Sequence, residues 1–386
     1  MMDLTEFSDI APYSDEEASS ALTRLSNHPN AKWVSKVIFP DKPETFLPEM
    51  LRNIHTVDEF QRIVMNKAIH WVVDTSMTSF TYEGVDILEN MEKEGTKYLT
   101  MSNHRDIILD PALFQILLQH YKIPETQICV GDNLLKQKSV ELLIRSNRMI
   151  KVIRGISARE LYLSSQLLSK YIRETITSGI SSVWIAQRQG RTKDGTDTTE
   201  QGLLKMLDMS GTKDFVENFK ELNIVPFSIS YEYEPCDILK AREILISRTQ
   251  KYVKGETEDL QSIMMGIRQK KGHVHLAIVE PITEEEIQDA ANADKNDRYQ
   301  SLRHTLDNRI IKAYKLWKTN YMAYDMVNGG SKYGCYYTPE DMEGFKAYVA
   351  QRLMMAEPSL DRDQLKDIFL RIYSNPVSEK EQRNLL

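Results

Sequence analysis

Short runs rich in β-branched and aromatic residues alternate with longer, apolar-periodic stretches through the middle of this 386-residue chain. This alternation is typical of βα units, in which helices cover both faces of a mostly parallel sheet. The sequence therefore predicts an α/β fold with a mostly parallel central sheet flanked by helices. The expected strands are 80–82, 98–101, 127–130, 149–153, 182–186, 224–231 and 274–279, and the expected helices between them include 113–121, 157–177, 200–209 and 236–252.

Both ends of the chain are poor in strand signals. We therefore expect a helical N-terminal region over residues 1–79, an α/β core over 80–282 and a helical C-terminal region over 283–386. The C-terminal region shows one long amphipathic segment at 302–324 and two more after Thr338 and Asp361. Residues 192–199 are polar and lack periodicity, so they are expected to form a flexible insert. Residues 46–73 are amphipathic, and a core-facing helix is favoured there over a membrane-docking one.

The amino-acid composition limits the cellular locations and the binding partners to be expected. A net charge of −7 argues against nucleic acid as a partner, since that role usually needs a basic surface. The three cysteines, Cys129, Cys236 and Cys335, are odd in number and far apart, which favours a reducing, cytoplasmic location. The sequence shows neither a signal peptide nor a stretch apolar enough to span a bilayer. If the substrate is a lipid, we expect peripheral contact with the inner face of the membrane.

A histidine and two carboxylates follow the second expected strand. His104 comes just after the apolar run 98–101, with Asp106 and Asp110 two and six positions later. Asp110-Pro111 predicts a helix start, with the Asp as cap and the Pro at the first helical position. His104 would then lie at the carboxyl end of a strand, where open α/β sheets usually place their chemistry. We interpret it as a general base oriented by Asp110, or by Asp106 if the loop runs differently. The simpler alternative is that His104 only ends a strand and Asp110 only caps a helix.

Other catalytic patterns fit poorly. The His-Arg-Asp string resembles a kinase motif, but Pro111 occupies the position of the required Asn and no glycine-rich loop is present. The Gly-x-Ser-x-Gly elbow is absent, and Cys129 lies in an apolar run typical of a structural cysteine. No metal site is expected, since the rings of His273 and His275 would point to opposite faces of the strand at 274–279. A histidine that works without a protein nucleophile remains, and it suits attack of a substrate hydroxyl on a thioester.

Basic residues recur after later strands of this acidic chain. Arg154 follows the strand at 149–153, and Arg188, Gly190, Arg191 and Lys193 follow the strand at 182–186. Glycine permits close approach of the backbone to a ligand, and the arginine fork matches phosphate oxygens. Because Arg154 and Arg191 lie just past strand ends, on the same side of the sheet as His104, an anionic substrate is expected. A solvated charged surface is the interpretation for Lys136 and Lys138.

Four segments together resemble one enzyme family. Residues 102–105 with a following Asp are similar to the first motif block of the glycerolipid and lysophospholipid acyltransferases, which include glycerol-3-phosphate and 1-acylglycerol-3-phosphate acyltransferases. Residues 147–154 resemble its second block, an apolar strand ending in arginine. Residues 184–191 resemble its third block, and 224–229, with a proline inside a strand, its fourth. The four blocks occur in the family's order over about residues 80–280.

The resemblance implies an enzyme of phospholipid biosynthesis that transfers an acyl group directly from acyl-CoA or acyl carrier protein. The implied acceptor is the hydroxyl of glycerol phosphate or lysophosphatidate, and no further cofactor is expected. It implies His104 as the base and assigns acceptor binding to Arg154, Gly190 and Arg191, with Arg188, Gln189 and Lys193 in the same loop. It also implies that Pro226 shapes the pocket.

The chain departs from the family pattern at two points. Five residues separate His104 from Asp110, where the family usually has four, and Gln189 replaces a typical Glu. Two alternatives therefore stay open. The first is the same chemistry on a lyso-aminolipid acceptor, and the second is a catalytically silent lipid-binding relative.

Overall fold

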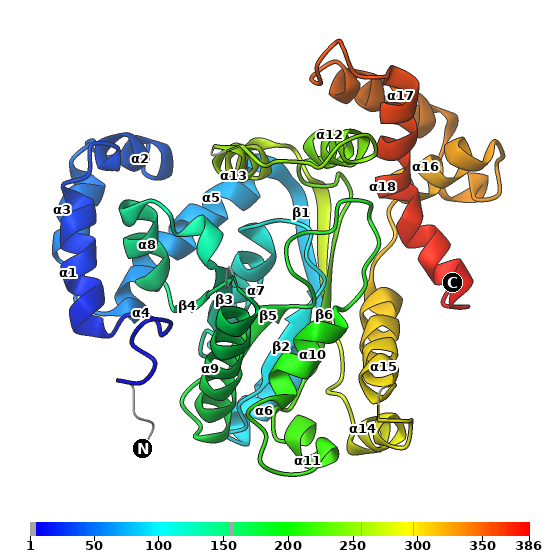
Figure 1. Cartoon of the computed structure of the whole chain (residues 1–386). Coiled ribbons are helices and arrows are strands. Elements are labelled where there is room, and N and C mark those ends of the chain that lie inside the picture. Colours follow the sequence, from blue (N-terminus) through cyan, green and yellow to red (C-terminus); the bar gives the residue numbers. More distant parts are fainter. Residues whose placement is uncertain (1–4, 155–156, 256, 296) are drawn as a thin grey trace.

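A seven-stranded sheet forms the centre of the molecule (Figure 1). The computed structural model describes residues 5–154, 157–255, 257–295 and 297–386. The strand order is β1-β7-β6-β2-β5-β3-β4. Neighbouring strands are parallel except for β6 and β7, which are antiparallel. The strands are β1 (Met77–Glu83), β2 (Leu99–Ser102), β3 (Gln127–Gly131), β4 (Met149–Val152), β5 (Val183–Ala186), β6 (Val225–Tyr231) and β7 (Gly272–Ile278).

Helices cover both faces of this sheet, which confirms the predicted α/β class. Every residue of β2 and β6 is buried, as expected for strands packed on both sides. One apolar cluster joins β2 and β5 to α9, α10, α11, α14 and α15, and the other joins the opposite face to α5, α6 and α7. The helices of the central region are α6 (Val85–Lys93), α7 (Leu109–His120), α8 (Lys138–Arg145), α9 (Ala158–Thr177), α10 (Gln201–Asp208), α11 (Phe215–Lys220), α12 (Asp237–Ser247) and α13 (Glu258–Arg268), with the short 3-10 turn η2 (Asp132–Leu134).

The N-terminal helices pack against one another; the first of them packs against α8, beside β4, and the last packs against α7 and β1 (Figure 1). They are α1 (Asp15–Ser26), α2 (Ala31–Ile38), α3 (Phe46–Arg52), α4 (Val57–Phe60), the π-helical turn η1 (Gln61–Met65) and α5 (Asn66–Ser76). Leu47, Leu51, Phe60 and Val64 are buried in a shared cluster. The apolar side of residues 46–73 therefore faces the core, as favoured from the sequence, and does not form a free docking face.

The C-terminal helices are α14 (Glu284–Ala291), α15 (Arg298–Ala313), α16 (Lys318–Asn328), α17 (Pro339–Leu353) and α18 (Arg362–Gln382), with the 3-10 turn η3 (Gly334–Tyr336). The last two begin after Thr338 and Asp361, as predicted, and the side chains of these two residues accept backbone hydrogen bonds. The single helix expected at 302–324 is wrong, because the chain leaves the helical conformation at Tyr314. The Tyr314 ring is buried against the Arg105 guanidinium, 4.7 Å from the ring centre, and this contact turns the chain away between α15 and α16.

The segment 192–199, predicted to be a flexible insert, is an ordered loop with several buried residues. Thr192 donates its backbone N–H to the His104 carbonyl at 2.8 Å, and Thr199 donates its own to Asp307 at 2.7 Å. The Asp197 carboxylate forms a buried ion pair with Arg105. Sequence polarity was misleading here, because these polar groups bind one another and the His104 loop instead of water.

The loop's contact with α18 predicts a pH-dependent stability. Glu379 accepts the Asp197 backbone N–H at 3.0 Å, and burial, together with the nearby Asp197 charge, raises the pKa of Glu379 to about 7. The folded state thus holds this proton to higher pH than the unfolded state, so the free energy of unfolding falls as pH rises from about 4.5 to about 7. Glu379→Gln should be more stable than the parent at pH 8, by up to about 3 kcal/mol, and indistinguishable near pH 4. Urea unfolding at both pH values checks this, and an equal effect at both would contradict it.

Candidate active site

The loop after β2 is held by two buried side chains that flank His104. The Asn103 amide donates to the Ile229 carbonyl at 3.0 Å and accepts the Ile229 N–H at 2.8 Å, so it takes the place of a strand residue beside β6. Arg105 is fully buried and pairs with Asp197 and Glu234. Because both neighbours point into the protein, His104 between them faces the other way.

His104 is held by Asp110. Its Nδ1 lies 2.8 Å from Asp110 Oδ2, and the His104 side chain is 13% exposed while Asp110 is fully buried. A buried carboxylate accepts hydrogen bonds, so Nδ1 carries the proton and Nε2 is left as the acceptor. This is the tautomer that a general base requires.

Three further donors fix Asp110. Its Oδ2 accepts the backbone N–H of Arg105 at 2.6 Å and that of Asp106 at 2.9 Å, and its Oδ1 accepts the Tyr231 hydroxyl at 2.8 Å. Tyr231 ends β6, so the central strand beside β2 supplies part of the support. Tyr231 was not among the site residues expected from the sequence, although its position at the carboxyl end of an expected strand placed it near the site.

Asp106 does different work. Its Oδ1 accepts the backbone N–H groups of Ile108 and Leu109, both at 2.9 Å, and so satisfies donors at the start of α7. The helix begins at Leu109, so the expected capping role of Asp110 is wrong: Asp110 lies inside the first turn and faces His104. Asp106 therefore supplies the cap that was expected of Asp110, and Asp110 contacts the His104 ring.

A cavity of about 940 Å³ opens in front of His104. It lies at the carboxyl ends of β3, β4 and β5, between α7, α8, α9 and α13. Seven of the residues singled out in the sequence line it: His104, Arg154, Arg188, Gln189, Gly190, Arg191 and Lys193. Asp106 and Asp110 lie behind His104. Pro226 lies within β6, paired with Met101 of β2, and is not part of the cavity wall.

The basic wall contains guanidinium groups whose hydrogen-bonding capacity is not filled by the protein. Arg191 is 6% exposed, and its Nη1 has no hydrogen-bond partner. Arg188 Nε is also buried without a partner. Arg154, Arg188, Arg191 and Lys193 thus place basic side chains on one wall of the cavity, which suits a ligand with anionic acceptor oxygens.

Glycines shape this wall at two points. Gly190 has a φ of 71°, which lies in the left-handed region, so the turn between Arg188 and Arg191 favours glycine. A Cβ on Gly131 would lie 2.8 Å from Arg154 Nη2, so the exposed Arg154 side chain crosses closely over this backbone. The arginines following β4 and β5 therefore reach one cavity.

Lys193 adds a titratable charge. Burial, with a smaller effect from Arg191, lowers the pKa of Lys193 to about 8, although Glu243 forms an ion pair with it. The lysine thus loses its charge as pH rises through 8. For an anionic ligand we expect binding to weaken over this range, and Lys193→Arg should flatten the dependence. The measurement is the acceptor's kcat/KM, or the affinity for inorganic phosphate, from pH 6.5 to 9.5; an identical pH profile in the variant would contradict this assignment.

The remainder of the wall is largely apolar. It runs along α7 and continues between α8, α9 and α13, with contributions from Ala112, Ile116, Ile144, Leu168 and Ile263. Cys129 also lines the cavity, but burial raises the pKa of its thiol. A protonated thiol is a poor nucleophile. Within the described part of the chain, Asp110 is the only hydrogen-bond partner of the His104 ring.

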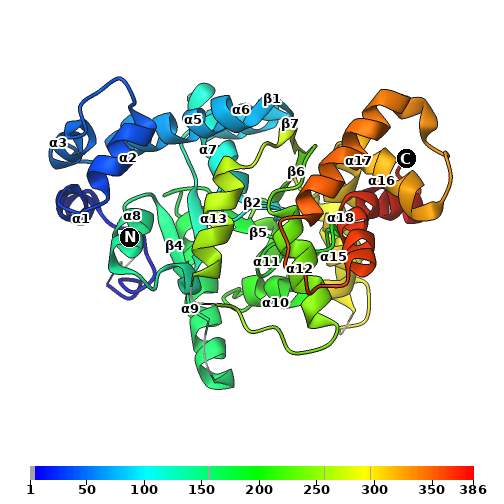
Figure 2. The same ribbon diagram turned by 90° about the horizontal axis from the view of Figure 1, so that it is seen from above.

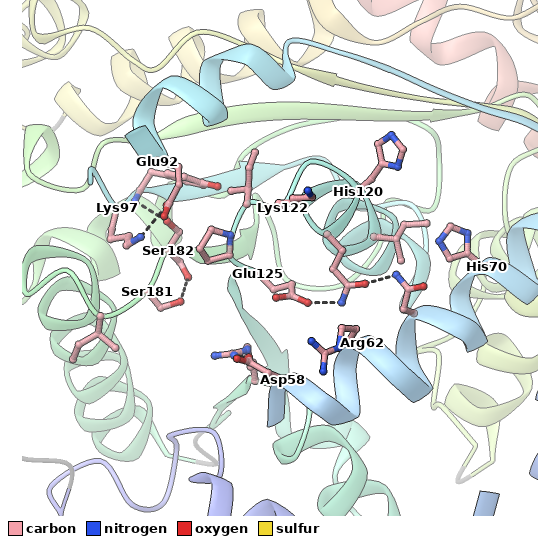
Figure 3. A pocket seen from close by; sticks show the side chains of 18 residues that line it. Asp58, Arg62, His70, Glu92, Lys97, His120, Lys122, Glu125, Ser181 and Ser182 are labelled. Atoms are coloured by element: carbon pink, nitrogen blue, oxygen red, sulfur yellow. Dashed lines mark hydrogen bonds and ion pairs between the residues drawn. The ribbon is translucent and has the colours of Figure 1, made fainter. Parts of the chain in front are cut away.

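A second, more polar cavity of about 640 Å³ lies at the opposite end of the strands (Figure 3). Tyr98, Ser182 and Glu125, which come just before β2, β5 and β3, help to line it. It shares Asn66, Ile116 and Gln119 with the larger cavity. The Asn66 amide donates to Gln119, and Gln119 donates to Glu125, so a polar chain stands where the two cavities meet. None of the sequence-predicted residues lines this cavity.

The expected arrangement of His273 and His275 is wrong. Residues two apart on a strand share a face, and both rings contact hydroxyls of the neighbouring β1: His273 meets Ser79 and His275 meets Thr81, each at 2.8 Å. Among the residues that the structure describes, no group of three or more His, Cys, Asp and Glu side chains is placed to hold a metal ion.

In the described ranges, every helix is too short or too polar to cross a bilayer.

No protein-family model matches the chain, and no curated protein matches its sequence significantly. Among solved structures, the chain is similar to the 1-acyl-sn-glycerophosphate (LPA) acyltransferase PlsC from Thermotoga maritima. The identity is 14% and the TM-score is 0.39, over 75% of this chain and 92% of that one. Both values are too low to assign an activity to this chain.

Proposed function

We propose that this protein is an O-acyltransferase that moves a fatty acyl group from an acyl thioester to the hydroxyl of an anionic glycerolipid acceptor. The observation that carries the proposal is the His104–Asp110 pair, which faces a cavity with basic side chains on one side and a long apolar wall on the other. A base, an anion site and an apolar groove are the three parts that such a transfer needs.

The reaction needs no protein nucleophile. His104 Nε2 takes the proton of the acceptor hydroxyl as its oxygen attacks the thioester carbonyl. The tetrahedral intermediate then breaks its C–S bond, and the departing sulfur takes the proton back from the imidazolium. An ester and a free thiol result, and Asp110 stabilises the charged ring between the two steps.

The basic wall supports a phosphate-bearing acceptor, such as glycerol phosphate or lysophosphatidate. Arg188, Arg191, Arg154 and Lys193 all line the same wall of the cavity. Bidentate guanidinium–phosphate contacts would hold the acceptor while its hydroxyl reaches His104. The apolar wall would hold the acyl chain, since burying it removes hydrocarbon from water. Acyl-CoA and acyl carrier protein are both suitable donors.

A panel of acceptors tests the proposal. Purified protein is incubated with labelled acyl-CoA or acyl carrier protein and, separately, with glycerol 3-phosphate, lysophosphatidate, a lyso-aminolipid or no acceptor. We expect labelled ester with a phosphate-bearing acceptor. Ester formed only with the lyso-aminolipid would show that the same reaction uses that acceptor instead. If no acceptor led to consumption of the thioester, the catalytically silent lipid-binding alternative would be favoured.

A further inference from the structure

Exposed apolar side chains gather around the mouth of the large cavity. Leu143 of α8, Leu161 of α9 and Leu260 of α13 are exposed and line the cavity. Tyr162 and Leu163, 57% and 51% exposed, adjoin Leu161, and Val253, 80% exposed, adjoins the lining residues Tyr252 and Lys254. We call these six residues the mouth patch. Figure 2 shows α8, α9 and α13 in the left and central parts of the molecule, away from the C-terminal helices α16, α17 and α18.

Positive charge surrounds this patch in a chain that is negative as a whole. The two segments that carry it, 132–163 and 248–263, contain ten Lys and Arg against six Asp and Glu, while the whole chain has a net charge of −7. Lys136, Arg159, Arg248 and Lys251 are among the exposed bases. Ion pairs engage three of the counted bases: Lys138 with Glu141, Lys254 with Asp259, and Arg148 with Asp58.

We propose that the mouth patch docks the protein on an anionic lipid bilayer, with the large cavity opening toward the lipid. Apolar side chains ringed by bases match an interface in which acyl chains lie beneath anionic headgroups. Continuity with the cavity explains the position of the patch, because a lipid substrate could enter without exposing its chain to water. This docking surface rests on the proposed lipid-acylating function, and it is separate from the N-terminal segment 46–73, where Leu47, Leu51, Phe60 and Val64 are buried.

The test is flotation of the full chain with vesicles of phosphatidylcholine alone or with about one-third phosphatidylglycerol. The wild type should float with the anionic vesicles and much less with the neutral ones. The triple variant Tyr162→Ser, Leu163→Ser, Val253→Ser should bind anionic vesicles roughly tenfold less. None of these three residues lines the cavity, so transfer between a dissolved short-chain thioester and glycerol 3-phosphate should be unchanged.

A matched control changes three exposed apolar residues elsewhere: Tyr336→Ser, Met354→Ser and Met355→Ser, all in the C-terminal helical region. It should float like the wild type. Equal flotation of wild type and mouth-patch variant would overturn the docking proposal, as would a wild-type dimer that the mouth-patch variant splits without any loss of vesicle binding. Flotation needs no turnover, so wild-type flotation without acyl transfer would remove only the proposed function, and soluble transfer without flotation would remove only the docking surface.

Discussion

Replacing His104 with alanine is expected to lower kcat for acyl transfer by about 100- to 10,000-fold, the contribution typical of a positioned general base. The Nδ1 atom of the ring is bound to Asp110, which leaves Nε2 free to accept the hydroxyl proton. Release of free thiol from the acyl donor in the presence of acceptor provides the rate. The side chain is partly exposed, so the thermal unfolding curve should change little.

Two carboxylate variants sharpen this test. Asp110→Asn should also cost about 100-fold or more, because an amide no longer stabilises the imidazolium and can hold the ring in the wrong tautomer. Asp106→Asn should retain most activity, because Asn is an equally good acceptor for the N–H groups of Ile108 and Leu109. Near-normal turnover in His104→Ala, or equal losses in Asp106→Asn and Asp110→Asn, would contradict the assignment of the base and its orienting acid.

Replacing Arg191 with alanine is expected to raise the acceptor's KM by about 10- to 100-fold, the range given by one or two lost charge-assisted hydrogen bonds. Because Arg191 is buried, the thermal unfolding of the variant is recorded as well, to separate lost acceptor binding from lost stability. Initial rates at varied acceptor and saturating acyl donor measure the effect. The donor's own KM should stay within about twofold, since the arginine lies on the basic wall and not on the apolar one.

Lys138→Ala is the matched control for this loss of a cation. Lys138 lies on α8, close along the chain to cavity residues, but it pairs with Glu141 at the surface and does not line the cavity. Its acceptor KM should equal that of the wild type. If both variants raised KM alike, general attraction by positive charge would explain the result. If Arg191→Ala left KM unchanged, the phosphate site would lie elsewhere.

Most of the fold could be predicted from local patterns in the sequence. All seven strands lie where short β-rich runs predicted them, because buried strands need continuous apolar residues that helices spaced between them do not show. The prediction of one helix over 302–324 was wrong for a nonlocal reason. Tyr314 packs on Arg105, more than two hundred residues away in the sequence, and local periodicity cannot reveal such a contact. The prediction of a flexible insert at 192–199 was wrong for the same reason, because its binding partners Arg105 and Asp307 are distant in the sequence.

The cavity-lining residues were found for a simple geometric reason. Parallel strands end at one edge of the sheet, so residues just after several such strands converge there, as His104, Arg154 and Arg191 do. The support of these residues was harder to find. Tyr231 contacts Asp110 across 121 positions of sequence, and the capping role of Asp106 depends on how the loop is held by Asn103 and Arg105.

Direct transfer without an acyl-enzyme is the central claim, and rapid mixing of stoichiometric acyl-CoA with the protein tests it. Free thiol is followed with and without lysophosphatidate, and the protein's mass is recorded at each time point. The account predicts thiol release only when acceptor is present, equal in amount to the ester formed, with the protein mass unchanged throughout. A burst of thiol without acceptor, matched by an acyl group on Cys129 or on a serine of the cavity, would contradict it.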